Sequence, residues 1–259
     1  MVRQSILSLA VVGLGLTPAL AQQATDDVSP EVRTGTSAFD TLSVEGQAAL
    51  AAKGEGAPTS AETWMVAAAN PLAVEAGAAV LAEGGTAADA MVAVQAVLGL
   101  VEPQSSGLGG GAFLVWYDAN TGRVTTLDGR ETAPLEATPT LFQTADGEPM
   151  GFWDAVVGGR SVGTPGTPML MQEAHARWGR AEWAGLFERA ISLADEGFTV
   201  SERLAGSVAA GAEMLQRFKA TADYFFPGGQ ALQAGDRLIN EAYADTLRLI
   251  AAHGSEIFY

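Results

Sequence analysis

The feature that most constrains the fold is a stretch that is apolar around its whole circumference. Between Ala90 and Val101 the only polar side chain is that of Gln95. Thr86 and Asp89, just before it, have the spacing of a capping box, which predicts that a helix begins here. A helix without a polar face must be covered by other helices or by a sheet. The run is too short to cross a membrane, which takes about 20 apolar residues, so we expect this helix inside a layered fold.

The segments on either side predict the covering layers. Asn70-Pro71 is a strong helix start because an N-cap residue precedes a proline at the first helical position, and Gly84-Gly85 ends that helix. Residues 112–117 and 123–127 are rich in β-formers and flank a turn, which predicts a hairpin. Later helices are expected at residues 168–178, at 183–196, from Ser201 onward, and over a pattern that ends at Gly254. Helices, a hairpin and helices again favour an α+β fold over an alternating one.

The N-terminus has the pattern of a secretory signal peptide. A basic start, an apolar run from Ile6 to Leu16 and an Ala-x-Ala ending predict removal of residues 1–21 by cleavage after Ala21. We therefore expect a periplasmic or secreted protein. Residues 22–62 are rich in small and acidic residues and predict a mobile leader. Folded structure is expected to begin near Trp64, in a domain over 63–259.

Composition narrows the possible partners. The formal net charge is -16 and no basic stripe is present, which argues against a nucleic-acid partner. No stretch after the N-terminal one is long and apolar enough to span a membrane, so no membrane span is expected. The chain has no cysteine and two histidines, His175 and His253. A metal site usually needs several such ligands, so we expect no metal and no cofactor.

Two motifs that resemble known sites do not have the context they need. Gly107-x-Gly109-x-x-Ala112 matches a loose dinucleotide fingerprint, but that motif needs a strand before it and a helix after it. Here a helix is expected before it and a strand after it, and we reject a nucleotide site. The glycines indicate either a tight turn or a close approach of the backbone to another backbone or a ligand.

The second motif centres on Ser161. Gly159-x-Ser161-x-Gly163 matches a nucleophile elbow, which places its serine on a sharp turn between a strand and a helix. A short strand is conceivable at residues 154–157, but the prolines and glycine that follow oppose an immediate helix. His175 and His253 lie in predicted helices and are typical of surface or capping histidines. A serine hydrolase is therefore a minor alternative.

Arg130 is the best candidate for a binding residue. Thr125 and Thr126 precede it, but they lie within a predicted strand, whereas a threonine nucleophile works from a freed chain start. Arg130 follows the strand and is flanked by Asp128 and Glu131. A guanidinium held in this way can grip a carboxylate through two parallel hydrogen bonds. A surface ion pair is the commoner use of such an arginine, and these residues alone leave both uses open.

Several segments together resemble one family, the γ-glutamyltransferases, in a single register from about Trp64 to Tyr259. They are Met65–Ala68, Ala76-Gly77, Leu81–Ala90, Pro103–Phe113, Leu127–Pro134, Val162–Gly166 and Gly254–Tyr259. The most specific are the Glu-Gly-Gly-x-Ala-x-Asp-Ala segment that ends at Ala90 and the Arg-Glu-x-Ala-Pro segment that begins at Arg130.

The resemblance implies an N-terminal-nucleophile hydrolase with an αββα sandwich, made as a zymogen that cleaves itself into a large and a small subunit. It further implies γ-glutamyl transfer and hydrolysis. The N-terminal threonine of the small subunit attacks a γ-glutamyl amide, and the acyl group passes to water or to an amino-acid or peptide acceptor. Glutathione is the best-known donor. Arg130 stands where the family's arginine holds the donor's α-carboxylate, and no catalytic residue of the family falls clearly within this span.

The chain departs from the family pattern by stopping early. The catalytic threonine, the oxyanion-hole glycines and the residues that hold the α-amino group are all expected beyond Tyr259. We therefore expect an inactive N-terminal part of the large subunit, with an incomplete sandwich. Within the same superfamily, a β-lactam acylase or a capsule amidase stays possible. A non-catalytic periplasmic binding protein is the alternative from another class.

Overall fold

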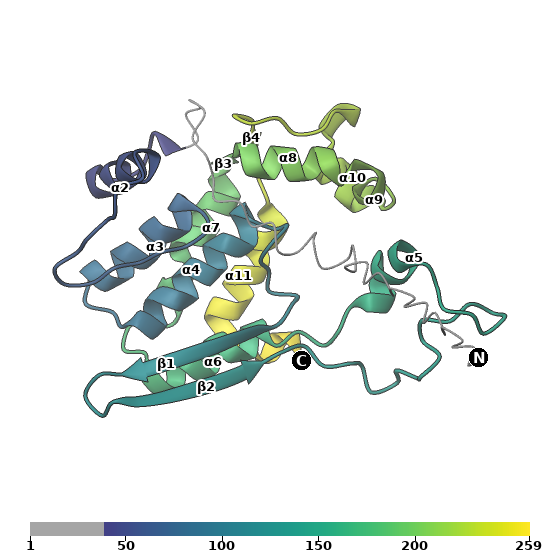
Figure 1. Cartoon of the computed structure of the whole chain (residues 1–259), viewed down its shortest axis with the longest axis horizontal. Coiled ribbons are helices and arrows are strands. Elements are labelled where there is room, and N and C mark those ends of the chain that lie inside the picture. The colour runs from purple at the N-terminus through teal and green to yellow at the C-terminus, as the bar shows by residue number, and fades with distance from the viewer. Residues whose placement is uncertain (1–38) are drawn as a thin grey trace, which may run out of the picture. The chain divides into compact units, whose positions relative to one another are not determined.

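The apolar helix predicted from the sequence is α4 (Ala87–Val101), and it lies in the core of the described residues (Figure 1). The structure is a computed structural model that describes residues 39–259. Helix α4 packs against α3 (Pro71–Ala82), α6 (Thr167–Trp178) and α7 (Glu188–Glu196). The predicted interior position of this helix is confirmed.

Both predicted N-terminal caps are present. The Asn70 side chain accepts a hydrogen bond from Leu72 N at 3.0 Å at the start of α3. Thr86 and Asp89 form the predicted capping box at the start of α4. These caps satisfy backbone N–H groups that have no partner inside their helices, and for this reason the helix starts were predictable.

The predicted hairpin consists of β1 (Ala112–Asp118) and β2 (Arg123–Gly129), paired antiparallel with Ala112 opposite Gly129. Helix α6 covers one face, where Trp116 stacks on Trp178 with ring centroids 4.7 Å apart. The opposite face carries large apolar side chains that are exposed in the described residues. They are Phe113, Val115, Tyr117 and Val124. We call these four residues the open hairpin face.

The second half of the described chain is helical. Helix α11 (Glu241–His253) packs on α7, and its Tyr243 hydroxyl donates to Ala96 O of α4 at 2.8 Å. Residues 183–196, expected as one helix, form a 3₁₀ helix η3 (Ala184–Phe187) followed by α7. The remaining elements are α5 (Phe152–Val156), η2 (Gly159–Ser161), β3 (Phe198–Thr199), α8 (Glu202–Ala210), α9 (Ala212–Leu215), α10 (Lys219–Phe225), η4 (Pro227–Gly229), β4 (Arg237–Leu238) and η5 (Ser255–Phe258). The α+β class is confirmed.

Part of the expected leader is folded. Helix α2 (Val44–Gly54) lies within it, and Phe39 and Leu42 before this helix are buried in the core cluster. The Ser43 hydroxyl caps α2 and donates to Glu75 Oε1 of α3 at 2.6 Å. Folded structure therefore begins before Trp64, because the Phe39 and Leu42 side chains pack into the hydrophobic core. The predicted signal peptide lies outside the described residues.

None of the helices within residues 39–259 is long and apolar enough to cross a membrane.

Candidate functional site

Arg130 lies directly after β2, where its own backbone and side chain are both held. Its N–H donates to Asp128 Oδ1 at 3.0 Å, and its Nε donates to Glu131 Oε1 at 2.9 Å. Nevertheless 65% of the side chain is exposed. Among the described residues, the structure pairs this guanidinium only with Glu131. One edge of the guanidinium is therefore fixed, while its terminal nitrogens face solvent.

Glu131 is suited to hold Arg130 in this way. Hydrogen bonds from its own backbone N–H and from the Arg130 side chain lower the pKa of its carboxyl below the usual value. The carboxylate is therefore ionised at neutral pH and acts as a permanent acceptor. Its pairing with one nitrogen sets the direction of the planar fork without using the fork's other donors.

The segment around Arg130 is packed against two distant glycine-containing turns. Gly110 O accepts hydrogen bonds from Gly166 N at 3.0 Å, from Thr167 N at 3.1 Å and from Thr167 Oγ1 at 3.1 Å. Thr132 and Thr164 form an isolated antiparallel bridge beside them. The bridge at Thr132 and the pairing of Gly129 with Ala112 fix the backbone on both sides of Arg130.

Gly111 shows how tight this packing is. A Cβ on Gly111 would overlap Glu131 Oε2 and would lie 2.5 Å from Glu131 N and 2.9 Å from Arg130 Cα. Of the two interpretations that the sequence left for these glycines, the structure supports the close approach of one backbone to another at Gly111.

Substituting Gly111 with alanine is therefore expected to push the loop away from Arg130. We expect a loss of about 1–3 kcal/mol in the free energy of unfolding, the usual cost of forcing extra volume into a packed site. Chemical denaturation measures this change. Gly109→Ala is the matched control, because a Cβ at Gly109 has nothing within 4 Å. Equal stability of the two variants would contradict the proposed packing.

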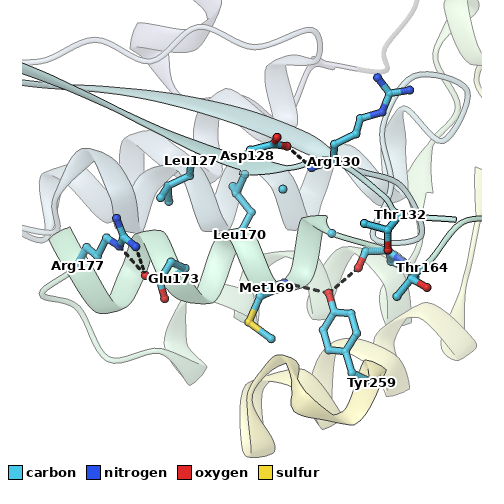
Figure 2. A pocket seen from close by; sticks show the side chains of 13 residues that line it. Leu127, Asp128, Arg130, Thr132, Thr164, Met169, Leu170, Glu173, Arg177 and Tyr259 are labelled. Carbon is cyan, nitrogen blue, oxygen red and sulfur yellow. Dashed lines mark hydrogen bonds and ion pairs between the residues drawn. The ribbon is translucent and has the colours of Figure 1, made fainter. Parts of the chain in front are cut away.

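A cavity of ≈ 450 Å³ lies between β2 and α6. Its lining includes Leu127, Met169 and Leu170, and Tyr259, whose hydroxyl donates to Pro165 O at 2.7 Å. Figure 2 shows the Arg130 guanidinium extending from the end of β2 in the direction opposite to Leu170 and α6. Arg130 is itself one of the residues that line the cavity, while its guanidinium extends away from Leu170 and toward solvent.

The other candidate residues are not brought into a site. Ser161 lies in η2 after a helix, α5, and not after the short strand considered from the sequence. Its hydroxyl donates to Val156 O at 2.5 Å and is also 3.2 Å from Gly158 O. His175 Nε2 instead bonds Ala181 O at 2.9 Å. Without a strand-to-helix turn and a histidine partner, Ser161 does not form a nucleophile elbow.

The two remaining motifs behave as the sequence predicted. Thr125 and Thr126 lie within β2, opposite Trp116 and Val115. The Gly107–Gly111 loop follows α4 and precedes β1, so it does not open a helix as a dinucleotide fingerprint does. The contacts of Gly110 and of Tyr259 were not predicted. The only sequence signal for them is the cluster of turn residues between Gly163 and Pro168.

Comparison with known proteins places this geometry in a family. The family model described as gamma-glutamyltranspeptidase matches residues 73–259. The glutathione hydrolase proenzyme of Bacillus subtilis (strain 168) is 43% identical over 195 residues, which are 75% of this chain and 33% of that protein. The acylase ACY 1 proenzyme of Pseudomonas sp. (strain V22) is 38% identical over 210 residues, 79% of this chain and 38% of that protein.

The structural comparison agrees. The crystal structure of Helicobacter pylori gamma-glutamyltranspeptidase superposes with a TM-score of 0.72 and 33% sequence identity, over 75% of this chain and 56% of that one. This confirms the predicted N-terminal-nucleophile hydrolase fold, of which the chain carries a part. The chain spans about a third of the length of the curated relatives it matches. It belongs to the γ-glutamyltranspeptidase family.

Proposed function

We propose that this chain is the N-terminal part of the large subunit of an enzyme that transfers and hydrolyses γ-glutamyl groups, with glutathione and other γ-glutamyl amides as donors. The observation that carries the proposal is Arg130, an oriented and exposed guanidinium in a member of this family. In this role Arg130 binds the α-carboxylate of the donor. Residues 39–259 hold no candidate nucleophile, and in this proposal the small subunit supplies it.

The chemistry of the donor fits this arrangement. A γ-glutamyl group carries its α-carboxylate at the end opposite the amide that reacts. A planar guanidinium can bind both oxygens of that carboxylate with two parallel hydrogen bonds, which fixes direction as well as position. Because Glu131 holds Nε, the terminal nitrogens are the ones available for this bond.

The reaction is an acyl transfer completed by a small subunit from the same precursor. The N-terminal threonine hydroxyl attacks the γ-carbonyl carbon, its own α-amine takes the proton, and the C–N bond breaks as the leaving amine is protonated. Water or an amino-acid or peptide acceptor then attacks the resulting ester and releases the threonine. Arg130 holds the donor through these steps and exchanges no proton.

The open hairpin face supports the small subunit as a partner. Phe113 is 66% exposed and Val115 is 71% exposed, on strands whose other face is covered by α6. An apolar sheet face of this kind is stable when a second layer packs on it. In the proposed enzyme the small subunit supplies that layer.

We also propose that the protein is exported to the periplasm or secreted. The proposal rests on the signal-peptide pattern of residues 1–21.

The β-lactam acylase alternative is kept because of the similarity to the acylase ACY 1 proenzyme. The test uses the full-length protein, with γ-glutamyl-p-nitroanilide and a side-chain-acylated β-lactam as competing donors. Release of nitroaniline, with γ-glutamyl transfer to an added dipeptide, supports the proposed function. Cleavage of the β-lactam side chain alone favours the acylase, and binding without turnover of either donor favours the binding protein.

Substituting Ser161 with alanine tests the remaining serine-hydrolase alternative. The Ser161 hydroxyl bonds only main-chain carbonyls in the described structure, so we expect donor turnover within about twofold of the parent value, as for other exposed substitutions. Steady-state turnover of γ-glutamyl-p-nitroanilide measures it. Loss of activity in a variant with unchanged circular dichroism would revive a nucleophilic role for Ser161.

A further inference from the structure

We propose that Arg203 and Glu102 form a positioning pair, which holds the loop of residues 104–111 against Arg130 and so sets how tightly the γ-glutamyl donor binds. The inference rests on the proposed function of Arg130. It assigns a role to two charged residues, on α8 and at the end of α4, that do not themselves reach the donor.

Glu102 is buried and its carboxylate is fully hydrogen-bonded, while Arg203 is half-buried. Glu102 is the C-cap residue of α4 and has no exposed surface. Its carboxylate accepts hydrogen bonds from Arg203 Nη1, from Asn70 Nδ2 at 3.0 Å and from Gln104 Nε2 at 2.6 Å. A buried carboxylate is tolerated only with such partners, and these come from before α3, from the loop and from α8.

The same arginine also holds the loop directly. Arg203 Nη2 donates to Ser105 Oγ at 2.9 Å, while Ser105 N and Ser106 N donate to Glu102 O at 2.9 and 3.0 Å. Gln95 Nε2 of α4 adds a bond to Ser106 Oγ at 2.8 Å. The first residues of the loop are therefore tied to α4 and α8 by both backbone and side chains.

The far end of the loop contacts the proposed donor site. Leu108 is buried in the core, Gly110 O accepts the three hydrogen bonds from Gly166 and Thr167, and Gly111 lies against Glu131. Glu131 is the residue that orients the Arg130 guanidinium. A displacement at Ser105 is thus passed along a short loop, which is anchored at Leu108, Gly110 and Gly111, to the group that binds the carboxylate.

Stability alone is a weak reason for such a pair. Replacing a buried ion pair with apolar residues is often neutral or stabilising, whereas removing one partner is costly. This asymmetry separates stability from positioning. A variant that lacks both charges can regain stability, but it still lacks the donor that holds Ser105.

Ser105→Ala is the first test, in the full-length protein. It removes the acceptor of Arg203 Nη2 and leaves the buried pair in place. We expect KM for γ-glutamyl-p-nitroanilide to rise about three- to tenfold, kcat to change less than about twofold, and Tm to stay the same, because a binding contact is loosened and the chemistry is untouched. Ser192→Ala, which removes a serine-to-glutamate bond on α7, is the matched control and should leave KM unchanged.

The second test compares Arg203→Met with the double variant Glu102→Gln/Arg203→Met. The single variant is expected to lower Tm and raise KM. The double variant is expected to regain most of the Tm while KM stays raised. Recovery of both quantities, or an unchanged KM in Ser105→Ala, overturns the positioning role.

These outcomes are distinguishable from failure of the proposed function. If the parent protein turns over no γ-glutamyl donor, the proposed function is wrong. The positioning role of Arg203 and Glu102 is then tested by the hydrogen-exchange rates of the Gly107–Gly111 amides. Faster exchange in Ser105→Ala than in Ser192→Ala supports the positioning of the loop. Equal exchange in the two variants overturns it.

Discussion

Arg130→Ala is expected to lower kcat/KM for a γ-glutamyl donor by about 10- to 150-fold in the full-length enzyme. This corresponds to about 1.5–3 kcal/mol, the range for a lost hydrogen bond to a charged group. The substitution removes the fork that we propose binds the α-carboxylate, and it leaves Glu131 without its cation. Initial rates with γ-glutamyl-p-nitroanilide measure the effect.

Two variants make this test specific. Arg130→Lys keeps the charge but lacks the planar pair of donors, so it should recover only part of the loss. Arg123→Ala is the matched control, because Arg123 is an exposed arginine at the other end of β2. Unchanged turnover in Arg130→Ala would remove the carboxylate role. An equal loss of kcat/KM in Arg123→Ala would show that the effect comes from surface charge in general and not from carboxylate binding by Arg130.

Asp89→Ala is expected to be the most destabilising of the substitutions considered, at about 3–5 kcal/mol. The Asp89 side chain has no exposed surface, and one carboxylate oxygen accepts from Thr86 N at 2.7 Å and from Thr86 Oγ1 at 2.9 Å. Arg180 N at 3.0 Å and Ala181 N at 3.2 Å donate to the same oxygen. Alanine leaves these donors without an acceptor, and urea denaturation measures the loss. Equal stability of Asp89→Ala and the parent would contradict this account.

The contribution of Asp89 also depends on pH. Burial by itself raises the pKa of Asp89, but hydrogen bonds from the Thr86, Arg180 and Ala181 backbones and from the Thr86 hydroxyl outweigh it and lower the pKa below the usual value. A carboxyl whose pKa is lower in the folded state stabilises the fold above its unfolded pKa, about 3.9 for aspartate. That stabilisation is lost as the pH falls through the folded pKa.

The expected measurement is a comparison of Asp89→Asn with the parent protein. The difference in their free energies of unfolding should be largest above about pH 5 and should shrink as the pH falls below about 4, since the parent then carries a neutral side chain as well. A difference that stays constant over this range would show that the charge of Asp89 contributes nothing.

The sequence predicted those features whose cause is local. The caps at Asn70 and Thr86, the apolar circumference of α4 and the hairpin of β-forming residues around a turn all depend on neighbours a few positions away. Arg130 was predicted as a binding residue from its position after the strand and from the family resemblance. The structure adds the orientation by Glu131, whereas the bond to the donor stays a prediction.

Features that depend on distant partners were not predicted. The bond between Arg203 and Glu102 joins residues 101 positions apart, and no local pattern marks Glu102 as buried. Helix α2 was missed because none of its residues is buried, so it shows no apolar face. The segment packs on the core through Phe39 and Leu42, which precede the helix. The change from 3₁₀ geometry in η3 to the α-helix α7 was missed because an apolar period continues through both elements.

The open hairpin face has a consequence for the order of assembly. Within residues 39–259, β1 and β2 pair only with each other, so the hairpin presents apolar side chains and open strand edges, a combination that promotes self-association. In the proposed single precursor the second layer is covalently tethered, so its effective concentration at this face is on the order of millimolar from the moment of synthesis. Cleavage after folding then costs little, because the partner is already in place. Separately expressed subunits must instead meet by diffusion while this face is exposed, and they are expected to aggregate in competition with assembly.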